Sequence, residues 1–258
     1  MEARSRFGPV SMFRQGTGDP VLVLHAAGGA GMWNPYLERL SEHFDVIAPD
    51  HPGFGLSAEL DGVDSIASLV EHYVSLLDTL ELERVSVVGA SLGGWLAAEI
   101  ASTVPARIDR LVLMAPPGIL IPDAPPADLF TMRPDEIVRA LFLDPAKAEA
   151  MLATPLPPEA AAQAERDAAS FAKYASEPFV HNPELPARLS RITAPTLVIT
   201  PEVDAVIPRE HSEAYAAAIK GAVLTVLPEC GHALYFEDPD LVADEVINFL
   251  AATPAPTR

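Results

Sequence analysis

Short runs of apolar residues recur along the chain, and helix-like patterns separate them. The runs predict strands at 9–13, 21–25, 45–48, 85–88, 111–114, 196–200 and 223–227. The run at 21–25 is apolar at successive positions, as in an inner strand that is buried on both faces. Strands that alternate with helices are typical of a mostly parallel sheet with right-handed crossovers. The pattern therefore predicts an α/β fold.

The helical patterns are clearest where apolar residues fall on one stripe. One stripe consists of Ile66, Leu69, Val70, Tyr73, Val74, Leu77 and Leu80. Further helices are expected at 34–43, 95–100, 209–219 and 240–251. For the last of these, Asp238 is the predicted N-cap and Pro239 the first helical residue.

Between 117 and 190 the alternation stops. Prolines cluster there, short Ala-rich helical pieces lie between them, and no run predicts a strand. We therefore expect one core domain made of residues 1–116 and 191–258, with residues 117–190 as an inserted helical segment. The Pro-rich tail at 253–258 is predicted to be frayed.

Composition limits the classes of partner. The 258 residues carry a formal net charge of -19, which opposes binding to nucleic acid and to anionic membrane surfaces. The single cysteine, Cys230, excludes a disulfide within the chain. No signal peptide and no apolar run of about 20 residues is visible, so a cytoplasmic location is expected. The sequence is compatible with a homo-oligomer.

A Gly-x-Ser-x-Gly motif follows the predicted strand at 85–88. It consists of Gly89, Ser91 and Gly93, and a helical pattern begins directly after it. A serine on so tight a strand-to-helix turn must adopt an unfavourable backbone conformation, which the flanking glycines make room for. The turn exposes the hydroxyl, and the amide of Leu92 at the helix N-terminus faces any negative charge that develops there. Ser91 is therefore the candidate nucleophile.

A serine hydroxyl needs a base, and the base needs a group that orients it. Reacting groups in such sheets lie beyond the carboxyl ends of the strands, which leaves His25, His51 and His232. His232 follows the last strand, whereas the other two are expected to be structural. Asp204 follows the penultimate strand and is the expected acid, with Glu202 as its competitor. The chain order Ser91, Asp204, His232 is the order expected when the nucleophile lies on such a strand-to-helix turn.

Together these motifs resemble the α/β-hydrolase fold superfamily, in the branch with a helical cap after the sixth strand. The resemblance rests on the loop after His25 and on the segments 50–57, 89–94, 204–208 and 231–232. It implies a mostly parallel, eight-stranded sheet flanked by helices, with residues 117–190 as the cap. It also implies that the amides of Leu92 and Ala27 form the oxyanion hole, with Ala26 as the alternative. Relatives usually have His-Gly where this chain has His25-Ala26.

The resemblance implies a serine hydrolase that cleaves a small carboxylic ester or lactone through an acyl-enzyme on Ser91. A C–C bond hydrolase that acts on a ring-cleavage product is the alternative. Such enzymes typically carry Trp after the catalytic histidine, where this chain has Ala233. A ligand-binding receptor built on the same fold is the alternative from another class. No cofactor and no metal are expected, and a small molecule is the expected partner. The predicted substrate-binding residues are Trp33, Phe130, Phe142 and Phe171.

Overall fold

A computed structural model describes residues 1–252, so the tail predicted to be frayed lies outside the described residues. The core is an eight-stranded sheet in the order β1-β2-β4-β3-β5-β6-β7-β8. The strands are β1 (Glu2–Ser5), β2 (Gly8–Gln15), β3 (Pro20–Leu24), β4 (Asp45–Pro49), β5 (Val85–Ala90), β6 (Ile108–Met114), β7 (Thr196–Pro201) and β8 (Val223–Leu227). The pairs β1–β2 and β2–β4 are antiparallel, and the others are parallel. The predicted mostly parallel, eight-stranded sheet is confirmed.

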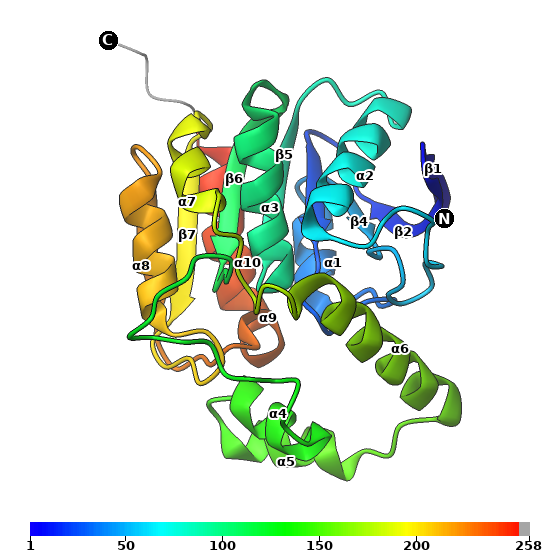
Figure 1. The fold of residues 1–258 in the computed structure, drawn as a ribbon, viewed down its shortest axis with the longest axis vertical. Helices are drawn as coiled ribbons and strands as arrows, with labels where there is room; N and C mark the ends of the chain where they lie inside the picture. Colours follow the sequence, from blue (N-terminus) through cyan, green and yellow to red (C-terminus); the bar gives the residue numbers. More distant parts are fainter. Residues whose placement is uncertain (253–258) are drawn as a thin grey trace.

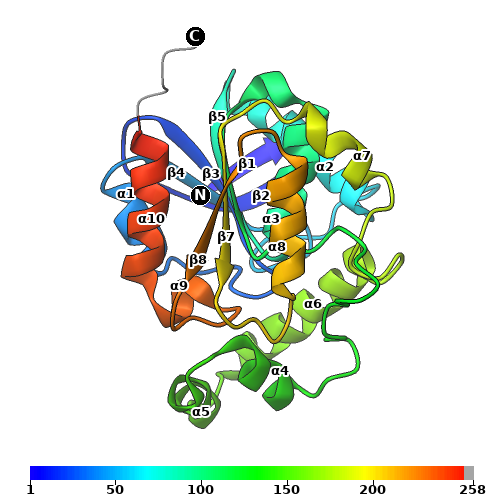
Figure 2. The same cartoon turned by 90° about the vertical axis from the view of Figure 1, so that its left-hand side faces the viewer.

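Helices cover both faces of the sheet (Figures 1 and 2). On one face lie α2 (Ile66–Thr79), α3 (Leu92–Thr103) and α8 (Arg209–Ala218), and on the other lie α1 (Pro35–Ser41) and α10 (Pro239–Ala251). Strand β3 shows why two apolar layers form. Its Leu22 and Leu24 pack into the first layer, whereas Val21 and Val23 pack into the second. Alternate side chains of a strand point to opposite faces, so an inner strand must be apolar throughout.

The last described helix, α10, begins with the predicted capping pattern. The Asp238 side chain accepts a hydrogen bond of 2.9 Å from the Leu241 amide, and Pro239 is the first residue of α10. Proline suits this position because its missing N–H would have no partner within the helix. The short helix α9 (Leu234–Glu237) precedes α10. Helix α9 therefore lies in the connection between β8 and α10.

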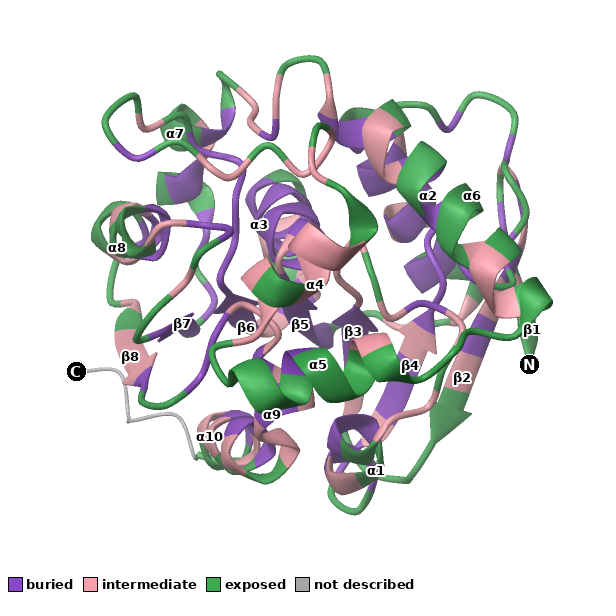
Figure 3. Cartoon of the chain, turned by 90° about the horizontal axis from the view of Figure 1, so that it is seen from below, coloured by how far each residue is buried: buried purple, intermediate pink, exposed green. Residues whose placement is uncertain are grey.

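The segment between β6 and β7 contains α4 (Pro134–Leu141), α5 (Pro145–Ala153), α6 (Pro158–Ala175) and α7 (Leu185–Arg188), and no strand is described there. Seen from below, α4 and α5 lie in front of the sheet and α6 lies beside α2; α5 is largely exposed, whereas α4 is mostly half-buried (Figure 3). Leu185 and Leu189, in contrast, are fully buried in the core that contains α3. The division into a core domain and a cap of residues 117–190 stays a prediction.

Among residues 1–252, none of the helices combines the length and the apolar character that crossing a membrane requires.

Candidate active site

Ser91 lies in a strained turn between β5 and α3. Its backbone has φ 50° and ψ -118°, a conformation that non-glycine residues rarely adopt. A Cβ on Gly89 would lie 2.1 Å from the carbonyl oxygen of Gly93, and one on Gly93 would lie 2.1 Å from that of Leu24. Both positions therefore require glycine because backbone atoms approach them closely. The turn places the Ser91 side chain at the N-terminal end of α3.

His232 lies between Ser91 and Asp204, although these residues come from separate loops. Its Nε2 lies 2.9 Å from the Ser91 Oγ, and its Nδ1 lies 2.8 Å from the Asp204 Oδ2. The other carboxylate oxygen of Asp204 accepts hydrogen bonds of 2.8 Å from the Val206 and Ile207 amides. The His232 and Asp204 side chains are 5% and 0% exposed, so water hardly competes for these contacts. Glu202, the competing acid, is exposed.

This geometry sets the protonation pattern of the imidazole. A carboxylate only accepts, so Nδ1–H of His232 donates to Asp204. Nε2 is then free of a proton and can accept the hydrogen bond of the Ser91 hydroxyl. The arrangement allows the imidazole to remove the serine proton, with the carboxylate holding the ring in place.

A cavity with apolar walls opens beside Ser91. Its empty space, including the mouth open to solvent, amounts to about 360 Å³. Ala27 and Leu92 line it, and so do Phe130 and Phe171. The Phe130 and Phe171 rings also contact each other, with their centroids 4.9 Å apart. The structure thus brings four of the predicted site residues to the nucleophile.

The two remaining predicted pocket residues lie elsewhere. Trp33 packs beside Phe13, with ring centroids 6.0 Å apart, and its indole N–H donates to Glu38. Phe142 directly follows α4 and is half-buried. The structure places neither side chain among the residues that line the Ser91 cavity.

The backbone around Ala27 bears on the question of oxyanion donors. Within residues 1–252, neither the Ala27 nor the Leu92 amide donates to another backbone group. Burial raises the pKa of the nearby Tyr235 hydroxyl to about 12, although the Ala26 backbone opposes this rise. Of the two alternatives in this loop, Ala27 lines the cavity beside Ser91, whereas Ala26 does not.

Two histidines, the half-buried His25 and the fully buried His51, connect the loop to its surroundings through hydrogen bonds. His25 Nδ1–H donates to the Ala26 carbonyl at 2.6 Å, and its Nε2 accepts from the His51 amide at 2.9 Å. His51 Nε2–H donates to the His25 carbonyl at 3.0 Å, and its Nδ1 accepts from the Tyr73 hydroxyl. Burial lowers the pKa of both imidazoles, and the proximity of His25 lowers that of His51 further. Both rings are therefore neutral hydrogen-bonding groups, and all their ring nitrogens are occupied.

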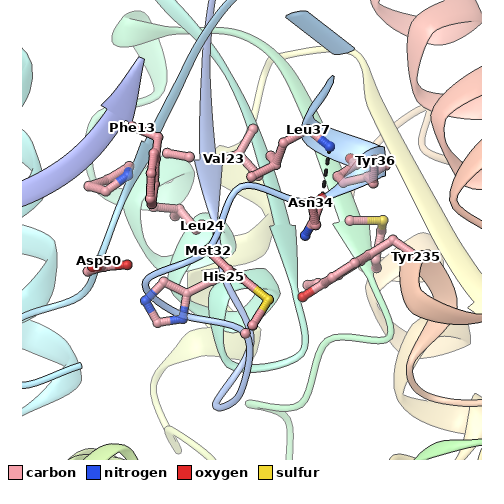
Figure 4. A pocket seen from close by; sticks show the side chains of 15 residues that line it. Phe13, Val23, Leu24, His25, Met32, Asn34, Tyr36, Leu37, Asp50 and Tyr235 are labelled. Atoms are coloured by element: carbon pink, nitrogen blue, oxygen red, sulfur yellow. Dashed lines mark hydrogen bonds between the residues drawn. The ribbon is translucent and has the colours of Figure 1, made fainter. Parts of the chain in front are cut away.

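A second cavity lies beside the same loop and shares no lining residue with the first (Figure 4). The His25 and Tyr235 side chains point toward it, and Asn34 lies at its edge. The Asn34 Oδ1 is engaged with the Leu37 amide at 2.9 Å, as the N-cap of α1. Ser91 does not line this cavity, so the nucleophile faces the cavity with Phe130 and Phe171.

Two buried carboxylates near the site were missed by the reasoning from sequence. Asp50 accepts from the amides of Gly31 at 2.6 Å and Leu56 at 2.9 Å, and so ties two loops together. Glu237, which is 6% exposed, accepts from the Gly231 amide next to His232. The sequence feature that could have indicated this role is the position of Glu237, a single charged residue directly after the apolar stretch 233–236. Within residues 1–252, no group of three or more His, Cys, Asp or Glu is arranged to hold a metal ion.

Comparisons with known proteins agree with this geometry. The model of the alpha/beta hydrolase family matches residues 21–245. A 2-hydroxymuconate semialdehyde hydrolase from Pseudomonas putida is 34% identical over 253 residues, which span 93% of this chain and 90% of that protein.

Solved structures are similar over nearly the whole chain. The 2-hydroxy-6-oxo-6-phenylhexa-2,4-dienoate hydrolase of Rhodococcus sp. strain RHA1 superposes with a TM-score of 0.77 at 25% identity, covering 98% of this chain and 99% of that one. The enol-lactonase of Burkholderia xenovorans LB400 superposes with a TM-score of 0.79 at 21% identity, covering 98% of this chain and 100% of that one, and shows the fold alone. The chain is a hydrolase that belongs to the alpha/beta hydrolase family.

Proposed function

We propose that this chain is a serine hydrolase that cleaves small, uncharged carboxylic esters or lactones through an acyl-enzyme on Ser91. The observation that carries the proposal is the position of the His232 imidazole, 2.9 Å from the Ser91 Oγ and 2.8 Å from the Asp204 Oδ2. These are the contacts that a base needs in order to activate a hydroxyl and keep its own orientation.

In the proposed reaction, the Ser91 Oγ attacks the carbonyl carbon while His232 Nε2 takes the hydroxyl proton. His232 then gives this proton to the leaving alkoxide as the bond between the carbonyl carbon and the alcohol oxygen breaks. Water attacks the resulting acyl-enzyme with His232 again as the base, which releases the acid and restores the serine. Asp204 stays ionised throughout and stabilises the imidazolium.

The negative charge on the carbonyl oxygen would be received by the amides of Leu92 and Ala27. Both residues line the cavity beside Ser91, and neither amide donates to another backbone group among the described residues. Leu92 is also the first residue of α3, where the helix dipole favours a negative charge. One such donor is worth roughly 2.7–4 kcal/mol of transition-state stabilisation.

The walls of the cavity favour an uncharged substrate. Among its described lining residues none is charged, and Phe130, Phe171, Val206 and Ile207 contribute aromatic and aliphatic surface. A carboxylate placed there would lose its hydration without gaining a cationic partner. The net charge of -19 also disfavours the approach of an anion.

Hydrolysis of a C–C bond is the second candidate. It is favoured by the relative that is 34% identical and is named a 2-hydroxymuconate semialdehyde hydrolase. A muconate semialdehyde carries a carboxylate, so the uncharged walls of the cavity make it the weaker candidate for this chain.

Turnover of p-nitrophenyl acetate and p-nitrophenyl butyrate, measured beside that of 2-hydroxymuconate semialdehyde, tests the proposal. We expect the esters to be cleaved with a kcat/KM well above that for the semialdehyde. The Ser91→Ala variant should lose roughly 10⁵-fold or more in kcat, whereas Ser190→Ala, at an exposed serine, should behave as the parent. Faster cleavage of the semialdehyde would establish the second candidate. Binding of the esters without any turnover would favour the third alternative, a ligand-binding receptor built on this fold.

A further inference from the structure

The carboxylate of Glu237 receives backbone N–H groups from two separate parts of the chain. Its Oε2 accepts from Gly231, the residue before His232. Its Oε1 accepts from Leu143 at 2.8 Å and from Asp144 at 2.9 Å, in the segment that joins α4 to α5. One buried carboxylate therefore connects the loop that carries His232 to the inserted helices.

Further contacts join the same two parts. The Ala233 amide, directly after His232, donates to the Leu141 carbonyl at 2.8 Å. The Lys147 ammonium group on α5 donates to the backbone carbonyl of Glu237 at 2.6 Å. His232 is thus flanked on both sides by residues whose amides are bound to Glu237 or to the end of α4.

The two segments are also closely packed. A Cβ on Gly231 would lie 2.6 Å from the backbone nitrogen of Leu143, so no side chain fits between the His232 loop and the inserted segment. An ionised carboxylate can accept all three N–H groups, and charge-assisted bonds of this kind are among the stronger hydrogen bonds in proteins. A neutral amide has one oxygen and would turn its NH₂ group toward at least one of these donors.

We propose that Glu237 is a positioning residue that holds His232 in line with Ser91 and makes this alignment depend on the seating of α4 and α5. The inference rests on the proposed function, because His232 is the base of that reaction. Among the described residues, no hydrogen bond joins Glu237 to the Ser91 hydroxyl or to the His232 ring. Glu237 acts through the Gly231 amide and through the segment 141–144.

The test compares Glu237→Gln with Glu229→Gln. Glu229 lies in the same loop and is exposed, so the control makes the same change of charge without touching the contacts. We expect Glu237→Gln to lower kcat for p-nitrophenyl acetate roughly 10- to 100-fold, the range that a small misplacement of a catalytic group produces. KM should change little because Glu237 does not line the Ser91 cavity.

A proton NMR spectrum supplies a readout that needs no turnover. The proton shared by His232 Nδ1 and Asp204 is expected far downfield, identified by its loss in His232→Gln. It should persist in Glu229→Gln and disappear or broaden in Glu237→Gln. If the parent chain cleaves no ester, loss of this signal in Glu237→Gln would still support the positioning role. Only the proposed function would then be rejected.

Lys147→Met tests the contribution of the inserted helices. This change keeps the length of the side chain and removes the contact with the Glu237 carbonyl. We expect a smaller loss in kcat, roughly threefold. In the double variant the two losses should not multiply, because Lys147→Met and Glu237→Gln release the same segment. If Glu237→Gln does not fold, the kcat of Lys147→Met decides, and an unchanged value contradicts the inference. A kcat and a downfield signal in Glu237→Gln equal to those of Glu229→Gln would also overturn it.

Discussion

Helices α3 and α4 both adjoin residues of the site, but they differ sharply in burial. Every residue of α3 from Leu92 to Ser102 is buried, whereas α4 contains no buried residue. Helix α3 is held by apolar packing against the sheet and α2, and so fixes Ser91 on a dense core. The inserted helices α4 and α5 meet the His232 loop through hydrogen bonds around Glu237. The nucleophile and the base are therefore held by different kinds of interaction.

The ion pairs of the two regions show the same contrast. On α3 the buried Glu99 pairs with Arg188 at 2.6 Å, and the Trp95 and Asn182 side chains donate to it as well. On α4 the half-exposed Arg139 pairs with Asp135 and Glu149. Exposed pairs of this kind stabilise a protein by about 0–1 kcal/mol. The inserted helices therefore gain little stability from their own charges.

The largest expected effect comes from the close packing of α3. In Gly93→Ala the new Cβ would lie 2.1 Å from the Leu24 carbonyl oxygen, so β3 and α3 must separate. We expect the free energy of unfolding in urea to fall by about 4 kcal/mol, although alanine favours helices. The control is Gly28→Ala, which meets no atom within 4 Å and should change stability little. Equal stabilities of the two variants would contradict the packing described for α3.

A matched pair of isoleucines compares the two helices directly. Ile100 on α3 is 0% exposed, whereas Ile137 on α4 is only half-buried. Ile100→Ala should lower the free energy of unfolding by about 3 kcal/mol, and Ile137→Ala by about 1 kcal/mol or less. Similar losses at the two positions, measured by urea denaturation, would show that α4 is packed as firmly as α3.

The smallest expected effect concerns the pH dependence of the core around α2, where the His72 ring lies near those of Phe7 and Tyr73. His72 on α2 is fully buried, neither ring nitrogen has a partner among the described residues, and burial lowers its pKa to about 4. The unfolded chain takes up this proton below a pH of about 6.5, whereas the folded chain does so only near 4. The stability is therefore complete above about 6.5 and falls as the pH decreases toward 4.

The substitution His72→Leu should remove this part of the pH dependence. At pH 5.5 the variant should regain about 1.4 kcal/mol relative to the parent, compared with their difference at pH 7.5. Urea denaturation at both pH values measures this difference. Parallel pH profiles for the two proteins would show that His72 does not titrate in this way.

The sequence predicted the central part of the sheet because inner strands must be apolar on both faces. Strand β1 (Glu2–Ser5) was missed as a separate strand. It lies at the edge of the sheet and pairs with β2 through its backbone, with Glu2 opposite Ser11. Only Ser5 of its four residues is buried, so the strand has no apolar pattern to detect.

The site also contains residues whose places could be predicted from the sequence and residues whose places could not. The order of the strands and the tight turn around Ser91 bring Asp204 and His232 to one edge of the sheet, so their proximity could be predicted from position in the chain. The places of Trp33 and Phe142 depend on how loops and inserted helices pack, which local patterns do not specify. The role of Glu237 was missed for the same reason, since its partners at 143 and 144 are distant in sequence.

Labelling with a fluorophosphonate tests most directly whether His232 activates the Ser91 hydroxyl. The intact chain should gain one phosphonyl group, mapped by peptide mass to residue 91, at a rate that falls steeply in His232→Gln. Attachment to another residue, or labelling at the same rate without the imidazole, would contradict the account.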